Sequence, residues 1–95
     1  MLVINLHFPD AGSLKGKRKD LSSIKAQLQR RLGVAVAETG YQDLWQRATL
    51  TAALTGGSLR RLAAAADEVE RWVLARCPDG ASVERLVASV EDLRG

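Results

Sequence analysis

The residues best suited to bind an anion cluster in one segment, SLKGKR at residues 13–18. The segment lies between a strand-like run and an amphipathic run, so it marks the point where a helix begins. Backbone N–H groups and the helix dipole favour phosphate at such a position, and Ser13, Lys15, Lys17 and Arg18 are the candidate anion- or RNA-binding residues. The spacing is not that of a nucleotide-binding P-loop. The alternative interpretation is a capping serine followed by a solvated first turn.

A second polar group lies near the middle of the chain, in and after a turn. Asp43 can end this turn, and Arg47 can pair with Asp43 or with Glu38. Trp45 is either a packing anchor or an exposed interface aromatic. We expect Arg47 to contribute to the anion or RNA site, and Gln42, Asp43 and Trp45 to an interface.

Catalytic and metal-binding residues are not expected. His7 is the only histidine, and no nucleophile or carboxylate partner is evident for it. Cys77 is the only cysteine, which excludes an intramolecular disulfide and a metal site built from Cys pairs. We place Cys77 in the core and expect no cofactor. A reducing, cytoplasmic setting fits this cysteine usage best.

The chain length of 95 residues and the 46% hydrophobic content predict one globular domain spanning residues 1–95. No apolar run is long enough for a membrane span, and no signal peptide is recognisable. The net charge of +3 is unevenly distributed. Residues 1–32 carry seven basic and two acidic side chains, whereas residues 33–95 carry seven basic and nine acidic ones. This asymmetry points to an anionic partner, although a solvated helix face is the alternative.

Period-two alternation predicts strands at residues 2–8, 34–39, 45–54 and 82–92. We place Leu86, Ala88 and Val90 on the inner face of the last strand. Helical spacing predicts two helices, which follow the N-cap candidates Ser13 and Ser58.

The order strand–helix–strand–strand–helix–strand predicts an α+β, ferredoxin-like fold, with a four-stranded antiparallel sheet and two helices on one face. The opposite face is expected to be polar and partly solvated. We place on it Asn5, His7, Arg47, Thr49, Thr51 and Arg85, with Val83 and Val87 as apolar members that a partner subunit would cover.

Two sequence strings carry a family resemblance: SLKGKR at residues 13–18, and VAVAE at residues 34–38 followed by QDLWQRA at residues 42–48. Together they resemble the YlxP-like family, small bacterial domains of unknown function with a ferredoxin-like fold. Genes of this family often lie near genes for transcription elongation, translation initiation and ribosome maturation, which implies a role around RNA or the ribosome. The resemblance implies no enzymatic activity and no catalytic residues.

The chain departs from the family pattern at two positions. Gly12 stands where a His is usual, and Gly16 stands where a Glu is usual between the two lysines. That Glu would complete a capping box, and Gly16 raises the cost of helix formation by up to about 1 kcal/mol relative to Ala. We therefore expect the first helix to start near Lys17 and the basic segment to be loose.

Three functions are considered for a chain with these features. The first is a non-enzymatic RNA- or ribosome-associated module that binds through charge and shape, because the open face of the first and third strands has no Phe or Tyr for base stacking. No signature of a DNA sequence reader is present. The alternative is a protein-interaction or homodimer-forming module that uses the open sheet face. An acylphosphatase-like enzyme is third, because the Gly-rich phosphate cradle expected after the first strand is not convincing.

Overall fold

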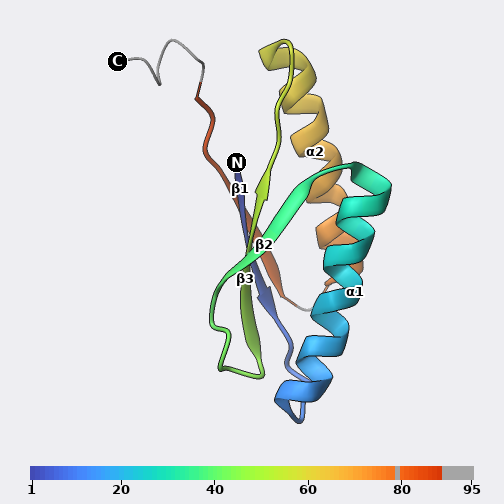
Figure 1. The fold of residues 1–95 in the computed structure, drawn as a ribbon, viewed down its shortest axis with the longest axis vertical. Helices are drawn as coiled ribbons and strands as arrows, with labels where there is room; N and C mark the ends of the chain where they lie inside the picture. The colour runs from blue at the N-terminus through green and yellow to red at the C-terminus, as the bar shows by residue number, and fades with distance from the viewer. Residues whose placement is uncertain (79, 89–95) are drawn as a thin grey trace.

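The chain forms two layers, a four-stranded sheet and two helices that cover one of its faces (Figure 1). The computed structural model describes residues 1–78 and 80–88. In chain order the elements are β1 (Leu2–His7), α1 (Leu14–Leu32), β2 (Ala35–Gly40), β3 (Arg47–Ala53), α2 (Leu59–Arg76) and β4 (Ala81–Arg85). The strand order is β2-β3-β1-β4, and every neighbouring pair is antiparallel. This confirms the predicted ferredoxin-like α+β fold.

Side-chain caps determine where the two helices begin. The Ser13 hydroxyl accepts a hydrogen bond from the Gly16 backbone N–H at 3.1 Å, and Ser58 does the same for Arg61 at 3.2 Å. Both serines are extended, as N-cap residues are. The expectation that α1 starts near Lys17 is wrong, because the Ser13 cap holds the first turn in place despite Gly16.

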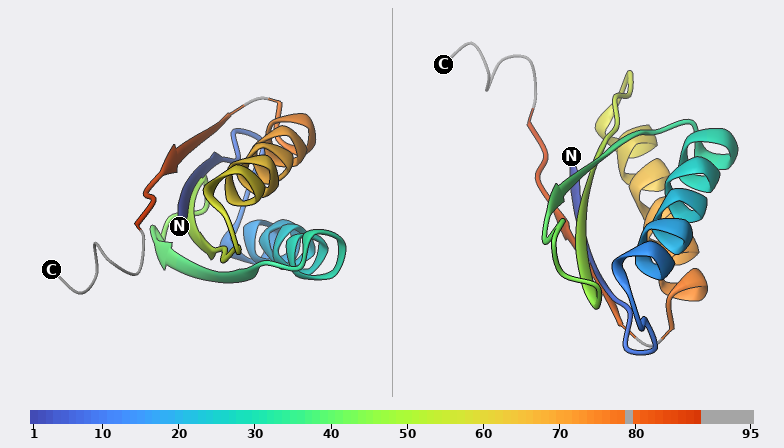
Figure 2. Two further views of the ribbon diagram at one scale, coloured as in Figure 1. Left: turned by 90° about the horizontal axis from the view of Figure 1, so that it is seen from above. Right: turned by 60° about the horizontal axis from the view of Figure 1, so that its bottom comes forward.

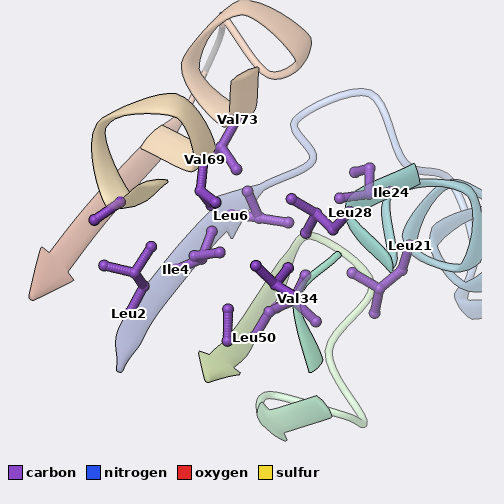
Figure 3. Close-up of a cluster of buried hydrophobic side chains, with 13 residues drawn as sticks. Leu2, Ile4, Leu6, Leu21, Ile24, Leu28, Val34, Leu50, Val69 and Val73 are labelled. Carbon is purple, nitrogen blue, oxygen red and sulfur yellow. The ribbon is translucent and has the colours of Figure 1, made fainter. Parts of the chain in front are cut away.

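The core lies between the inner face of the sheet and the two helices, which lie side by side over that face (Figure 2). Its buried members come from β1, β3, both helices and the residue just before β2 (Figure 3): Leu2, Ile4, Leu6, Leu21, Ile24, Leu28, Val34, Ala48, Leu50, Ala52, Ala66, Val69 and Val73. Phe8, Trp72 and Cys77 are partly buried and pack against this cluster. Burial of these apolar side chains holds the helices to the sheet.

The open face of the sheet is polar where β1 and β3 pair. Asn5 pairs with Thr49 and His7 with Arg47, and the sequence predicts these residues on this face. The Thr49 hydroxyl donates to the Asn5 side-chain oxygen at 2.9 Å, and the Thr51 hydroxyl lies 2.9 Å from that of Thr39. The strands therefore present hydroxyl and amide groups to solvent.

The last strand differs from its prediction in length and in register. It ends at Arg85, and Val83 pairs with the buried Ile4, so Val83 faces the helices and packs against the core. The His7 N–H donates a hydrogen bond to the Gly80 carbonyl at 2.8 Å. The pairing of β4 with β1 therefore begins one residue away from the predicted register. Leu86 is exposed and lies beyond the strand, as does Ala88. Val90 lies outside the described residues.

The shifted register also corrects the position of Arg85. Its guanidinium pairs with Asp67 at 2.6 Å and with Glu70 at 2.7 Å, both on α2. The hydrogen bonds that the guanidinium donates to these carboxylates, Glu70 first, raise the pKa of Arg85 above its ordinary value. Arg85 therefore belongs to the helix side of the sheet, and Ser82 and Glu84 are the residues of β4 that pair beside the open-face positions Asn5 and Val3.

Candidate functional site

The predicted anion-binding residues at the β1–α1 junction have different environments. The Ser13 hydroxyl is occupied as the cap of α1. Lys15 and Arg18 are exposed to solvent, as expected. Lys17 is turned inward, so the structure contradicts its assignment to the surface site.

Lys17 is buried, with 1% of its surface exposed. Its ammonium group donates hydrogen bonds to the backbone carbonyl of Tyr41, at 2.5 Å, and to that of Leu44. It lies four residues before Leu21 and seven before Ile24, so its aliphatic stem continues their buried stripe. That spacing was the sequence signal that could have revealed it. Lys17 links α1 to the β2–β3 loop, residues 41–46.

Five of the six other cations of α1 form an outer cationic face: Lys15, Arg18, Lys19, Lys25 and Arg30. At 100° per residue these five positions fall within an arc of about 140° that lies outside the buried stripe, and Arg31 falls outside the arc. All are exposed except Lys25, which is half-buried. Asp20 is the only acidic residue of α1, and it falls outside this arc. In the part of the chain that the structure describes, both ion pairs belong to Arg85, so the outer cationic face is not neutralised by carboxylates.

The β2–β3 loop carries the predicted interface residues of the middle of the chain. Gln42, Asp43 and Trp45 are all exposed, so Trp45 is not a packing anchor, and its role at an interface stays a prediction. A turn closes the loop, because the Leu44 N–H donates to the Tyr41 carbonyl at 3.1 Å. The loop thus forms an ordered projection beside the first turns of α1.

Arg47 contacts an aromatic ring instead of a carboxylate. Its guanidinium carbon lies 4.4 Å from the centroid of the Tyr41 ring, a cation–π geometry. Neither of the predicted pairings, with Asp43 or with Glu38, is among the ion pairs of residues 1–78 and 80–88. The Arg47 charge therefore stays available at the end of β3 next to the loop.

A cavity of about 510 Å³ opens between the β1–α1 junction and the end of α2. Its charged and titratable lining comprises His7, Asp10, Lys19, Asp20, Arg76 and Cys77. Two carboxylates balance the two permanent cations, so the described lining has no strong preference for an anion. Burial raises the pKa of the Cys77 thiol, with Arg76 partly opposing and Asp20 adding to the effect. The thiol is therefore protonated and weakly nucleophilic near neutral pH.

The two valine interface candidates fall in different places. Val83 faces the core, as described above. Val87 is 62% exposed and lines an apolar pocket of about 220 Å³ together with Met1, Leu54 and Leu59. This pocket lies at the end of β3 opposite to the β2–β3 loop, so the predicted interface residues do not form one surface.

Neither a metal-binding cluster nor a membrane-spanning helix is present among the described residues. No group of three or more His, Cys, Asp or Glu side chains among residues 1–78 and 80–88 is arranged to hold a metal ion. Neither helix in that part of the chain has both the length and the apolar character that crossing a membrane requires.

Similarity to known proteins covers most of the chain. Residues 1–92 match the family described as "Protein of unknown function (DUF503)". The uncharacterized protein YlxP of Bacillus subtilis (strain 168) is 39% identical over 74 residues, which cover 67% of this chain and 80% of that protein. No solved structure matches the chain. The chain belongs to the YlxP-like family of proteins of unknown function.

Proposed function

We propose that this chain is a non-enzymatic module that binds RNA, free or within the ribosome, through the outer cationic face of α1. The observation that carries the proposal is the composition of that face. Five cations share one solvent-facing side of the helix, its single acidic residue lies elsewhere, and no ion pair among the described residues neutralises them.

The size of the outer cationic face suits a polyanion. Lys15 and Arg30 are about 22 Å apart along the helix axis, at 1.5 Å per residue. Contacts with several phosphates release counterions from the nucleic acid, which gives affinity without reading the base sequence. Within the predicted basic junction, the exposure of Lys15 and Arg18 supports the proposal, and the other three cations of the outer cationic face extend the proposed site.

The proposal is tested with two charge-reversal variants of equal net charge. The first, Lys15→Glu with Arg18→Glu, changes the outer face of α1. An acidic residue is favourable in the first turn of a helix, so α1 should still form. The control, Arg60→Glu with Arg71→Glu, changes two exposed positions of α2. Fluorescence polarisation with a labelled RNA measures the affinity at low and at physiological salt.

We expect the α1 variant to lose roughly tenfold or more in RNA affinity, and the α2 control to lose only a few-fold. Equal losses would mean that diffuse net charge, and not this face, is responsible. Absence of RNA binding by the unmodified chain at low salt would reject the proposal.

The alternative function, self-association through the open sheet face, loses part of its support. Val83 faces the core, and Val87 lies beyond β4 at the apolar pocket. The β1–β3 part of the face presents mainly hydroxyl, amide and basic groups. Self-association through the open sheet face stays a prediction, which sedimentation velocity over a range of concentrations would test.

A further inference from the structure

The β2–β3 loop exposes large hydrophobic side chains that the fold does not use. Tyr41 is 43% exposed, Leu44 46% and Trp45 49%. The chain has four aromatic residues in all, and the other two, Phe8 and Trp72, pack against the core. Half of the aromatic residues are therefore placed at the surface in a single loop, which points to a ligand that contacts them.

This loop is held in one conformation by contacts at both ends. Buried Lys17 donates to the carbonyls of Tyr41 and Leu44. The Phe8 N–H donates to the Gln46 carbonyl at 2.7 Å, where the chain leaves β1. A loop that is already ordered loses less conformational entropy when it binds a ligand.

The backbone and the side chain of Tyr41 are both constrained. Its φ of 58° is the only positive φ of a non-glycine residue in the described ranges. Arg47 lies against its ring. A sparsely populated backbone conformation costs free energy and is typical of functional sites. The positive φ and the Arg47 contact together keep the Tyr41 ring exposed beside a cation.

The charge around the loop favours a nucleic acid over a protein partner. Arg47 is exposed, lies against an aromatic ring and forms no ion pair with a carboxylate among the described residues. Asp43 is the one acidic residue in residues 41–47. Lys17 also ties the loop to the first turns of α1, where the outer cationic face begins. An exposed aromatic ring complements a base, and a neighbouring cation without a carboxylate partner complements its phosphate.

We propose that the β2–β3 loop stacks an unpaired RNA base, with Trp45 as the main platform and the Tyr41–Arg47 pair as a second one. This inference rests on the proposed RNA-binding function and names its ligand as single-stranded RNA. Bases within a duplex already stack on each other and are not free to stack on the loop. The loop thus supplies the base contact that the open face of the sheet lacks.

The experiment uses the intrinsic fluorescence of Trp45 in a Trp72→Phe background, with circular dichroism to confirm folding. A short oligouridylate and an RNA duplex of the same length are titrated separately. We expect the oligouridylate to quench Trp45 and the duplex to leave it nearly unchanged. In polarisation measurements, Trp45→Ala is expected to weaken oligouridylate binding about 5- to 100-fold and duplex binding less than about twofold.

Two neighbouring substitutions serve as controls. Trp45→Phe keeps a stacking ring and is expected to retain most of the affinity. Leu44→Ala removes an exposed aliphatic group from the same loop and should leave oligouridylate binding within about twofold.

Three outcomes overturn the inference, and they are distinguishable. If Trp45→Ala binds oligouridylate as the unmodified chain does while the α1 charge reversal loses affinity, the stacking platform is wrong and the proposed function stands. If the unmodified chain binds no RNA at low salt, both the stacking platform and the proposed function are rejected. If Trp45→Ala keeps its RNA affinity but loses a nuclease-resistant protein partner in a pull-down, the loop is a protein-docking surface.

Discussion

At the scale of single residues, Lys17 connects the helix that carries the cations to the loop that carries the aromatic rings. Its buried ammonium is satisfied by two carbonyls and by no carboxylate among the described residues. Burying a charge is costly unless its hydrogen bonds are made, so the two loop carbonyls must stay in place for α1 to pack as it does. One side chain therefore couples helix packing to loop conformation.

Replacing Lys17 should destabilise the fold, whereas replacing its exposed neighbour should not. Lys17→Met keeps a similar apolar stem but removes two charge-assisted hydrogen bonds, so we expect the free energy of unfolding to fall by about 1–3 kcal/mol. Lys15→Met, in the same turn of α1, should change it by less than about 0.5 kcal/mol. Urea unfolding measures both. Equal stability of the two variants would contradict a structural role for Lys17.

Cys77 allows a prediction about pH. Burial raises the pKa of its thiol, with Arg76 opposing and Asp20 adding to the effect. Only the thiolate reacts with iodoacetamide, so the midpoint of alkylation against pH should lie higher in the folded chain than in urea. The folded state holds the thiol proton more tightly, so this term stabilises the fold below the unfolded pKa and is lost as the pH rises through the folded pKa. Coincident midpoints would show that burial does not perturb the thiol.

At the scale of elements, the start of α1 shows a cap outweighing a poor helix former. Ser13 satisfies the Gly16 N–H, and the Lys17 N–H reaches the Ser13 carbonyl at 3.2 Å. These two contacts close the first turn even though Gly16 favours the unfolded chain. The exposed lysine and arginine of this turn are thus presented by ordered helix.

Two glycine substitutions should change stability in opposite directions. A Cβ added at Gly16 would contact only the Ser13 hydroxyl, at 3.4 Å, so Gly16→Ala should stabilise the chain by up to about 1 kcal/mol. Gly33 ends α1 with a φ of 64°, a left-handed conformation, so Gly33→Ala should cost about 1 kcal/mol or more. Urea unfolding compares the two. A destabilised Gly16→Ala variant would indicate a requirement for glycine that the structure does not show.

The sequence predicts the elements well where the pattern that determines them is local. The Ser13 and Ser58 caps, the Gly33 stop and the Asn5–Thr49 side of the sheet all follow from spacing and residue type. Lys17 could not be assigned in the same way, because its partners Tyr41 and Leu44 lie 24 and 27 residues away. The charge of Lys17 favours a surface position, whereas its place in the apolar stripe of α1 favours a buried one.

The last strand shows the limit of periodicity more clearly. Two alternating sets of residues could face the core, and the apolar set at Leu86 and Ala88 looks as suitable as the set of Ala81 and Val83. A tertiary contact decides between them, since a Cβ on Gly80 would lie 2.6 Å from that of His7. The close approach of these two backbones places Val83 opposite Ile4, and sequence alone does not contain that contact.

At the scale of the whole molecule, the fold places the start of the proposed cationic surface and the proposed stacking loop at the same end of the molecule. The apolar face of the sheet packs against the helices, and its polar face has no Phe, Tyr or Trp on β1 or β3. The exposed aromatic rings lie instead in the β2–β3 loop, which Lys17 ties to the start of α1. Lys17 contacts the loop from the buried side of α1, so an RNA strand bound to the outer cationic face would have to pass around the first turn of the helix for charge and stacking to act on one ligand.

The salt dependence of RNA binding separates these two contributions. Each phosphate contact on a single strand adds about −0.7 to the slope of log affinity against log salt, so five cations predict a slope of about −3.5 at most. The Lys15→Glu, Arg18→Glu variant should flatten the slope by about 1.4, whereas the Arg60→Glu, Arg71→Glu control should leave it unchanged. Trp45→Ala should lower affinity at every salt concentration without changing the slope, because stacking releases no counterions. A slope near zero for the unmodified chain, or one that the α1 variant does not flatten, would show that α1 does not contact the phosphates.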